Sequence, residues 1–184
     1  MCDNGMVPAA YQYQPLRFEN AIRLVHIHPA RSRRAPILCD ISHANTEARY
    51  EALSYAWGDP ELSRRVILKE HSCTIRITES LHNALLHLRQ ADRVRVIWAD
   101  GICIHQADNS ERNHQVQLMA RIYQCARRVI VWLGGNDPVT DYGFSVLQCI
   151  AECQNRSFTV GVIVRGVLKP MIEESSKAHW YQIA

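Results

Sequence analysis

The sequence has 184 residues, 47% of them hydrophobic, which is enough for one sizeable core and too little for two comfortable domains. Its 21 Lys and Arg residues against 18 Asp and Glu leave a formal net charge of +3, and the basic residues are scattered except at 31–34. No aromatic residues interleave with that small basic cluster, so the sequence predicts no nucleic-acid partner.

Seven cysteines are an odd number, include no CxxC pair and follow an N-terminus without a secretory leader. They predict free thiols in a reducing compartment, and hence a cytoplasmic protein. The longest run with little polarity, residues 158–168, is far shorter than the roughly 20 residues of a membrane span and carries Arg165. We therefore predict a buried strand there and no membrane span.

The first part of the chain predicts β-structure. After an irregular lead-in at residues 1–20, apolar runs bounded by turn residues predict five strands. The first two form an antiparallel pair and the last two a hairpin, and the strands are 21–28, 36–42, 51–57, 64–69 and 73–77.

The apolar spacing then becomes helical. In residues 78–90 Leu81, Ala84, Leu85 and Leu88 share one face, and Thr78 can cap the first amides. A strand at 94–98, a second helix and a strand at 128–133 follow; the second helix has its apolar positions at Val116, Met119, Ile122, Tyr123 and Ala126. This alternation predicts an α/β fold, with antiparallel N-terminal strands followed by a parallel βαβ core and a further helix at 139–153.

The polar turn before the second helix has two interpretations. Asp108 can accept hydrogen bonds from the first helical amides, and Glu111 can reach back to complete a capping box. Alternatively, a glutamate held at a helix start beside a strand end is placed to bind sugar hydroxyls or to stabilise a developing positive charge. Local sequence favours capping, and the two roles can coexist.

Two predicted strand ends also carry candidate site residues, because ligands of α/β sheets bind at the carboxyl ends of strands. Asp100 follows the strand at 94–98, and Trp57 and Gly58 follow the strand at 51–57. Trp57 either packs in the core, the favoured interpretation, or stacks on a flat ring of a ligand. Ser54 lacks the Gly-x-Ser-x-Gly elbow of a hydrolase nucleophile.

Other reactive side chains favour structural roles. Cys103 lies between Ile102 and Ile104, which indicates a buried, inert thiol. His26 and His28 share one face of a strand, but no third ligand is spaced to join them, so we predict no metal site.

Three ordered segments resemble one family, the fungal heterokaryon incompatibility (HET) domain. They are YEALSYAWGDP (50–60), IWADGICIHQAD (97–108) and ERNHQVQLMARIYQCARRVIVWLGG (111–135), and residues 78–89 are also similar. The similarity covers residues 21–135. It implies a HET domain at residues 21–154, a lead-in at 1–20 and a C-terminal segment at 155–184 that is a truncated end of the domain.

The resemblance implies a role in fungal non-self recognition and regulated cell-death signalling, with other copies or other cell-death proteins as partners. HET domains are distantly similar to Toll/interleukin-1 receptor domains, some of which cleave NAD, and Glu111 matches the place of their catalytic glutamate. On this hypothesis NAD is a substrate and no cofactor is needed. Glu111 is then catalytic, and the ligand-binding residues are Ser54, Trp57, Gly58, Asp100 and Gln106.

The chain departs from the family motif at Ala99, Gly101 and His105, where HET domains usually carry isoleucine, alanine, and asparagine or aspartate. The Arg-x-Trp…Gln-Glu segment that usually follows is missing. Two alternatives to an enzyme therefore stay open, a non-enzymatic module that self-associates or binds a partner, and an incomplete, inactive copy.

Overall fold

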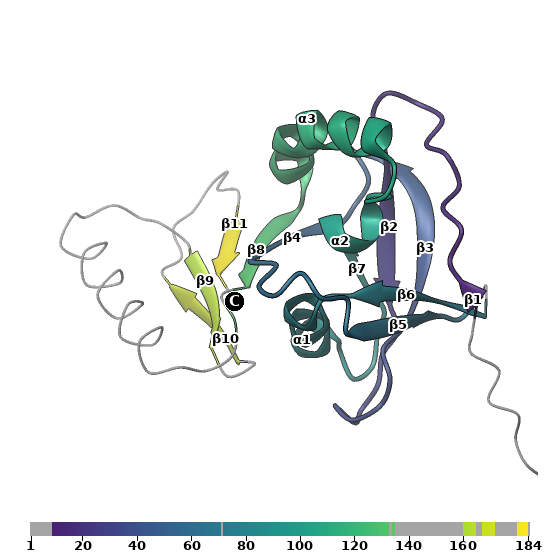
Figure 1. The fold of residues 1–184 in the computed structure, drawn as a ribbon. Coiled ribbons are helices and arrows are strands. Elements are labelled where there is room, and N and C mark those ends of the chain that lie inside the picture. The colour runs from purple at the N-terminus through teal and green to yellow at the C-terminus, as the bar shows by residue number, and fades with distance from the viewer. Residues whose placement is uncertain are drawn as a thin grey trace, which may run out of the picture.

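The computed structural model describes residues 9–70, 72–132 and 134, together with the backbone of strands at 160–164, 167–171 and 180–183. These residues form an α/β fold built on one mixed sheet (Figure 1). Its helices are α1 (Glu79–Leu88), α2 (Asp100–Cys103) and α3 (Asn109–Cys125). Its strands are β1 (Ala9–Ala10), β2 (Ala21–Ile27), β3 (Leu38–Asn45), β4 (Glu51–Tyr55), β5 (Arg64–Leu68), β6 (Cys73–Ile77), β7 (Arg95–Trp98), β8 (Arg128–Trp132), β9 (Val160–Val164), β10 (Val167–Met171) and β11 (Trp180–Ile183).

The sheet has the strand order β1-β6-β5-β3-β2-β7-β4-β8-β11-β9-β10. Six of its ten neighbouring pairs are parallel, so it is mixed but mostly parallel. The predicted antiparallel pair is confirmed as β2 and β3, in register from Ala21 opposite Asn45 to Ile27 opposite Cys39. The predicted hairpin is confirmed as β5 and β6.

The parallel core contains one strand more than the sequence predicts. Strands β7 and β8 both run parallel to β4, which lies between them. The connection that includes α3 must therefore cross an intervening strand, and its 17 residues span roughly 25 Å at 1.5 Å per residue. The prediction of a parallel β-α-β unit is confirmed in direction, but β7 and β8 are not direct neighbours.

The two long helices differ in how well their buried faces were predicted. Helix α1 buries Leu81, Ala84, Leu85 and Leu88, as the spacing predicts. In α3 the prediction is wrong for Val116, which is 55% exposed. The helix instead buries Gln115, whose Nε2 donates to the Ala21 carbonyl at 2.9 Å. That hydrogen bond lets a polar side chain occupy a core position.

The polar turn after β7 contains a short helix that the sequence does not predict. Helix α2 buries Ile102 and Cys103, and the Cys103 amide bonds to the carbonyl of Ala99 at 2.8 Å. Ala99 itself is fully buried beside Trp98. Because α2 lies directly at the end of β7, it fixes the positions of Asp100, its first residue, and of His105, two residues beyond its end.

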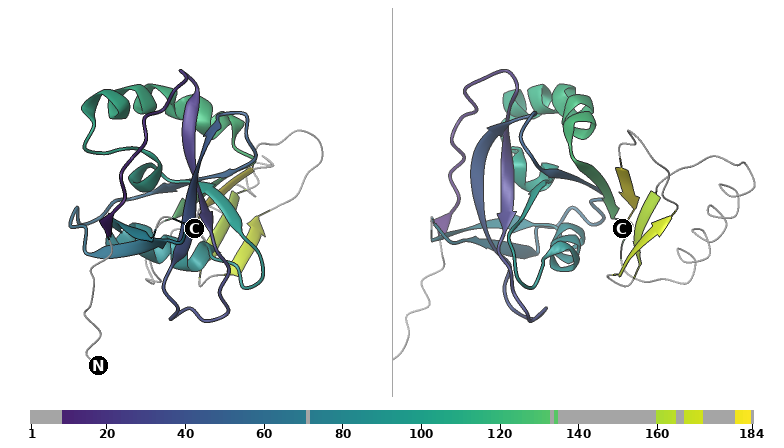
Figure 2. Two further views of the ribbon diagram at one scale, coloured as in Figure 1. Left: turned by 90° about the vertical axis from the view of Figure 1, so that its right-hand side faces the viewer. Right: turned by 180° about the vertical axis from the view of Figure 1, so that it is seen from behind.

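The ends of the described chain lie towards opposite edges of the sheet, β1 at one edge and β11, β9 and β10 at the other. The segment at residues 11–20, which we call the N-terminal strap, leaves β1 and crosses the molecule towards α3 before it enters β2 (Figures 1 and 2). Beyond β8, β11 pairs in parallel with β8 and β9, and β9 and β10 form an antiparallel pair. The run at 158–168, predicted as one strand, is thus divided between two strands.

Some predictions concern residues that the structure does not describe. The helix predicted at 139–153 lies outside the described residues, as do the side chains of 158–168. Among the helices that are described, none combines the length and apolar character that crossing a membrane requires.

Candidate functional site

Two of the predicted residues lie at helix starts. Thr78 is the N-cap of α1 and its side chain accepts the Leu81 amide at 3.3 Å. Asp108 is the N-cap of α3, and its Oδ1 accepts the amides of Ser110 at 2.9 Å and Glu111 at 3.1 Å. Each bond satisfies a helix-terminal N–H that has no partner within the helix.

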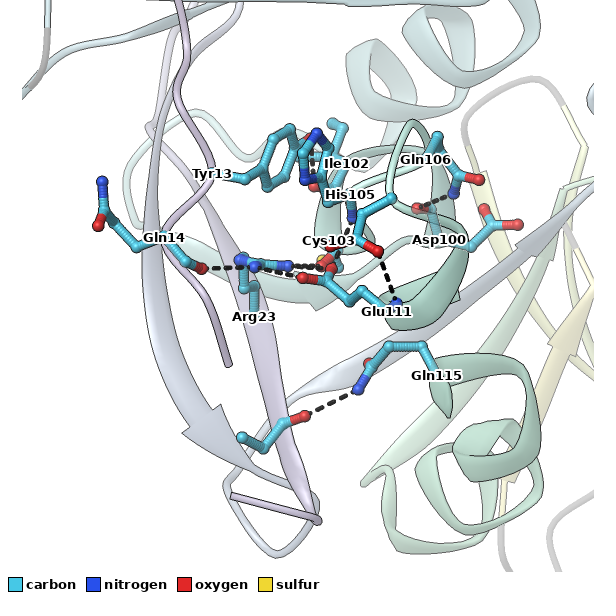
Figure 3. A network of polar contacts seen from close by, with 12 residues as sticks. Tyr13, Gln14, Arg23, Asp100, Ile102, Cys103, His105, Gln106, Glu111 and Gln115 are labelled. Carbon is cyan, nitrogen blue, oxygen red and sulfur yellow. Dashed lines mark hydrogen bonds and ion pairs between the residues drawn. The ribbon is translucent and has the colours of Figure 1, made fainter. Parts of the chain in front are cut away.

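Glu111 does not complete the predicted capping box. Its carboxylate faces Arg23 on β2, with Nη1 to Oε1 at 2.6 Å and Nη2 to Oε2 at 2.9 Å (Figure 3). Oε1 also accepts the amide of His105 at 2.7 Å, in place of the Asp108 amide that a capping box would use. The reason is electrostatic, because a buried guanidinium binds a carboxylate more strongly than a single amide does.

Arg23 is the residue that sequence reasoning missed. Its side chain is fully buried, and its terminal nitrogens also donate to the carbonyls of Cys103 at 3.0 Å and Gln14 at 2.6 Å. One guanidinium therefore ties together β2, α2, α3 and the N-terminal strap. Burial alone would raise the pKa of Glu111, but the hydrogen bonds from Arg23 and His105 and the Arg23 charge outweigh it and lower that pKa.

The N-terminal strap is bound to the same cluster by Tyr13. Its hydroxyl donates to the Ile102 carbonyl at 2.8 Å, and its ring stacks on His105 with centroids 4.7 Å apart and planes 10° apart. The Arg23 guanidinium lies 5.0 Å from the centre of the Tyr13 ring, within the range of a cation–π contact. His105, a departure from the family motif, thus serves as a platform for the strap.

A second cluster surrounds Trp57 at the end of β4. Trp57 Nε1 donates to Asp100 Oδ2 at 2.9 Å, and the Trp57 ring stacks on Tyr55 with centroids 6.4 Å apart and planes 6° apart. Asp100 Oδ1 accepts the Gly101 amide at 2.7 Å, and Gln106 Nε2 donates to the Asp100 carbonyl at 2.8 Å. Trp57 is 37% exposed, so the prediction that it packs in the core is wrong.

The exposure of Trp57 has a local cause. Strand β4 ends at Tyr55, two residues earlier than the predicted strand at 51–57, so Trp57 lies outside the sheet. Gly58 follows it with a φ of +66°, a left-handed conformation that glycine adopts readily. Asp100 then holds the indole by its N–H at the surface instead of letting it enter the core.

The structure contains two clefts that share the Tyr13–His105 stack as a wall. The smaller cleft, about 540 Å³, lies between the strap residues 15–19 and the start of α3, where it is lined by Asp108, Glu111 and His114. The larger cleft, about 950 Å³, extends from the Trp57 cluster to the β5–β6 hairpin. Tyr13 and His105 line both.

The predicted site residues are therefore divided. Glu111 lines the smaller cleft, and Trp57 and Gln106 line the larger one. Asp100 binds the Trp57 indole, while Ser54, half-buried on β4, and Gly58 line neither cleft. The sequence predicts site residues at two strand ends, but it does not predict that Tyr13 of the strap stacks on His105 between the two clefts.

The cysteine and histidine side chains take structural positions. Cys103 is fully buried, and burial raises the pKa of its thiol to about 12, which keeps it protonated. His26 Nε2 contacts Ser42 Oγ at 2.7 Å and His28 Nε2 contacts Asp40 Oδ2 at 2.5 Å. Within the described residues, no three His, Cys, Asp or Glu side chains are grouped as metal ligands.

The fold and the site together define an α/β module whose motif residues meet around α2 and the start of α3. Comparison with known proteins gives this module a family. Residues 50–180 match the family model described as heterokaryon incompatibility protein (HET), and the chain belongs to this family.

A curated relative supports the assignment. The chain is 36% identical over 144 residues to "Heterokaryon incompatibility protein 6, OR allele" of Neurospora crassa, an alignment covering 71% of this chain and 21% of that protein. The chain therefore spans about a fifth of the relative's length. No solved structure matches the chain, so similarity to Toll/interleukin-1 receptor domains stays a prediction.

Proposed function

We propose that this chain acts in fungal heterokaryon incompatibility as a HET module, which converts non-self recognition into regulated cell death by binding other copies or partner proteins. The family match and the name of the Neurospora crassa relative support the incompatibility role. We place the module in the cytoplasm, a location supported by the free thiols of Cys39, Cys73, Cys103 and Cys125.

One observation carries the preference for a binding module over an enzyme. Glu111, the best catalytic candidate in the family motif, spends both carboxylate oxygens on Arg23 and the His105 amide. A carboxylate that is engaged on both oxygens inside the fold has little left to offer a substrate. The motif around Glu111 is then explained by the connection that it makes between α3, β2 and the strap.

Inducible expression in a filamentous fungus tests the module. We expect cells that accumulate the folded chain to take up a membrane-impermeant dye after induction. The double variant Arg23→Met/Glu111→Leu replaces the buried pair with apolar side chains, an exchange that is often neutral for stability. If Glu111 has only a structural role, cells that express the double variant should take up as much dye as cells that express the wild type. Folded wild-type chain that accumulates without loss of viability would sink the proposal.

NAD cleavage is the second candidate. The observation in its favour is that Glu111 lines the smaller cleft together with His114, at the positive end of the α3 dipole. Movement of the N-terminal strap would open Glu111 to a ligand. In that state a glutamate could stabilise the positive charge that develops on a ribose as a glycosidic bond breaks.

The assay for this candidate measures NAD loss with purified wild type, Glu111→Gln and Glu79→Gln. Glu79 also pairs with an arginine at 2.6 Å, but both side chains are more than half exposed, so this variant controls for the loss of a surface carboxylate. Circular dichroism first confirms that all three proteins are folded at the assay temperature. NAD loss with wild type and Glu79→Gln, but not with folded Glu111→Gln, would favour an enzyme. No NAD loss from folded wild type would end the candidate and leave the binding module untouched.

A further inference from the structure

The charges of the larger cleft are one-sided. Its lining includes Arg64, Arg65 and Arg76 but no aspartate or glutamate. The whole chain is nearly balanced, with 21 basic and 18 acidic residues, so this asymmetry is local. A concave surface with one sign of charge concentrates ions of the opposite sign.

Two of these arginines occupy a costly position. Arg65 on β5 and Arg76 on β6 are direct cross-strand partners, and both side chains are exposed. Like charges placed directly opposite one another destabilise an antiparallel pair. Within the described part of the chain neither one has a carboxylate partner in an ion pair. An anion held between them would remove the repulsion.

The geometry of Arg76 leaves it free to bind an acceptor. Its Nε donates to the Leu62 carbonyl at 2.9 Å, which orients the guanidinium, and its terminal nitrogens have no acceptor among the described residues. Arginine forks of this kind match the oxygens of phosphates and carboxylates. Arg64, by contrast, is already paired with Glu79 at 2.6 Å.

The other end of the cleft offers a flat aromatic surface. Trp57 is 37% exposed, it stacks on Tyr55, and its N–H is bound by Asp100. These contacts fix the plane of the indole before any ligand arrives. An aromatic side chain that is already fixed can stack on any flat ring of a ligand, and it loses little conformational freedom when the ligand binds. Leu62, 42% exposed, adds apolar surface beside the arginines.

We infer that the larger cleft binds a small ligand made of a flat ring joined to a polyanion, such as a nucleoside diphosphate. The ring stacks on Trp57 and the phosphates bind Arg65 and Arg76. The volume of about 950 Å³ lies within the usual range for small-molecule sites. The inference does not depend on NAD cleavage, because Glu111 lines the other cleft.

Isothermal titration of the purified 184-residue chain tests the site with ADP, adenosine, pyrophosphate and a hexaglutamate peptide. We expect saturable ADP binding at least roughly tenfold tighter than binding of the other three, since adenosine lacks the phosphates, pyrophosphate lacks the ring and the peptide lacks both. Equal or tighter binding of adenosine, pyrophosphate or the peptide would overturn the inference. So would the absence of saturable ADP binding by folded chain.

Variants locate the site. Arg65→Gln and Arg76→Gln should each weaken ADP binding by roughly tenfold, as expected for a lost charged hydrogen bond, and Trp57→Leu by a similar factor. Arg33→Gln removes the same charge from an exposed loop and should change binding by less than about twofold. Both glutamine variants remove a repulsion, so they should fold. Wild-type affinity in Arg65→Gln, Arg76→Gln or Trp57→Leu would overturn the assignment.

Discussion

The two clefts on either side of the Tyr13–His105 stack use arginine in opposite ways. Beside the smaller cleft, Arg23 is fully buried and donates to Glu111 and to two carbonyls. Along the larger cleft, Arg65 and Arg76 are exposed and face one another across a pair of strands. The first arrangement pairs a buried guanidinium with a carboxylate, whereas the second leaves two exposed guanidinium groups that a bound anion could pair. Stability should therefore depend on the smaller cleft, and binding on the larger one.

The largest effect that we predict comes from Glu111→Gln. The change removes the charge that compensates buried Arg23, and breaking a buried ion pair costs about 3–5 kcal/mol. Urea unfolding followed by circular dichroism measures the loss. Glu79→Gln is the matched control, because exposed pairs contribute about 0–1 kcal/mol.

The double variant Arg23→Met/Glu111→Leu sharpens this result. Removing both charges together avoids an uncompensated ion, so it should cost less than Glu111→Gln alone. If the single and double variants were equally unstable, the stability that this pair contributes would come from packing and not from charge.

The same pair predicts a dependence on pH. The folded-state pKa of Glu111 lies below its ordinary value of 4.5, so the stabilisation is fully present above that value and is lost as the pH falls through the folded-state pKa. The gap in unfolding free energy between wild type and Glu111→Gln should be constant from pH 7 to about 5 and shrink below pH 4.5. A gap that grew on acidification would contradict the sign of the shift.

The next effect concerns Tyr55, on which Trp57 stacks in the larger cleft. An alanine Cβ at Gly101 would lie 2.5 Å from the Tyr55 hydroxyl and 3.0 Å from Leu81 Cδ2. Forcing atoms into such a site costs about 1–3 kcal/mol, although the family motif usually has alanine there. Thermal and urea unfolding of Gly101→Ala measure the cost, and Tyr55→Phe in the same chain should recover part of it.

Gly58→Ala separates packing from backbone strain. An alanine Cβ at Gly58 would have its nearest neighbour 3.8 Å away, but the φ of this residue is +66°, so the cost arises from the left-handed backbone. Tyr55→Phe should not rescue this variant. Rescue of both glycine variants would mean that Tyr55→Phe stabilises the chain in general.

Tyr13→Phe is expected to have a smaller effect. It removes the hydroxyl that donates to Ile102 at 2.8 Å but keeps the ring on His105, so the expected loss is about 1 kcal/mol. Tyr123→Phe is a matched control, since its hydroxyl reaches the Leu53 carbonyl at a longer 3.4 Å. A larger loss of unfolding free energy in Tyr123→Phe than in Tyr13→Phe would show that the Tyr13 hydrogen bond stabilises the strap less than its length indicates.

These comparisons also show how far the sequence could lead. The spacing of apolar residues and the turn residues predict the strands, the β5–β6 hairpin and helix α1, because these elements depend on residues only a few positions apart. The Arg23–Glu111 pair joins residues 88 apart, and the alternation of β2 counts Arg23 among its polar positions although both faces of that strand are buried. The burial of Gln115 could not be predicted for the same reason, since its partner is the carbonyl of Ala21, 94 residues away.

The smallest predicted effect has the opposite sign. Removing one of two like charges from a cross-strand pair should stabilise the chain, so Arg65→Gln is expected to gain about 0.2–1 kcal/mol in urea unfolding at low salt. The gain should disappear near 1 M salt, where the screening length is about 3 Å. It should also shrink as ADP is added and reverse at ADP concentrations well above the wild-type dissociation constant, because a ligand of the folded state stabilises it by RT ln(1 + [L]/Kd) and the variant binds ADP about tenfold more weakly. A gain that persisted unchanged in salt and in ADP would mean that Arg65 is neither repelled by Arg76 nor used to hold an anion.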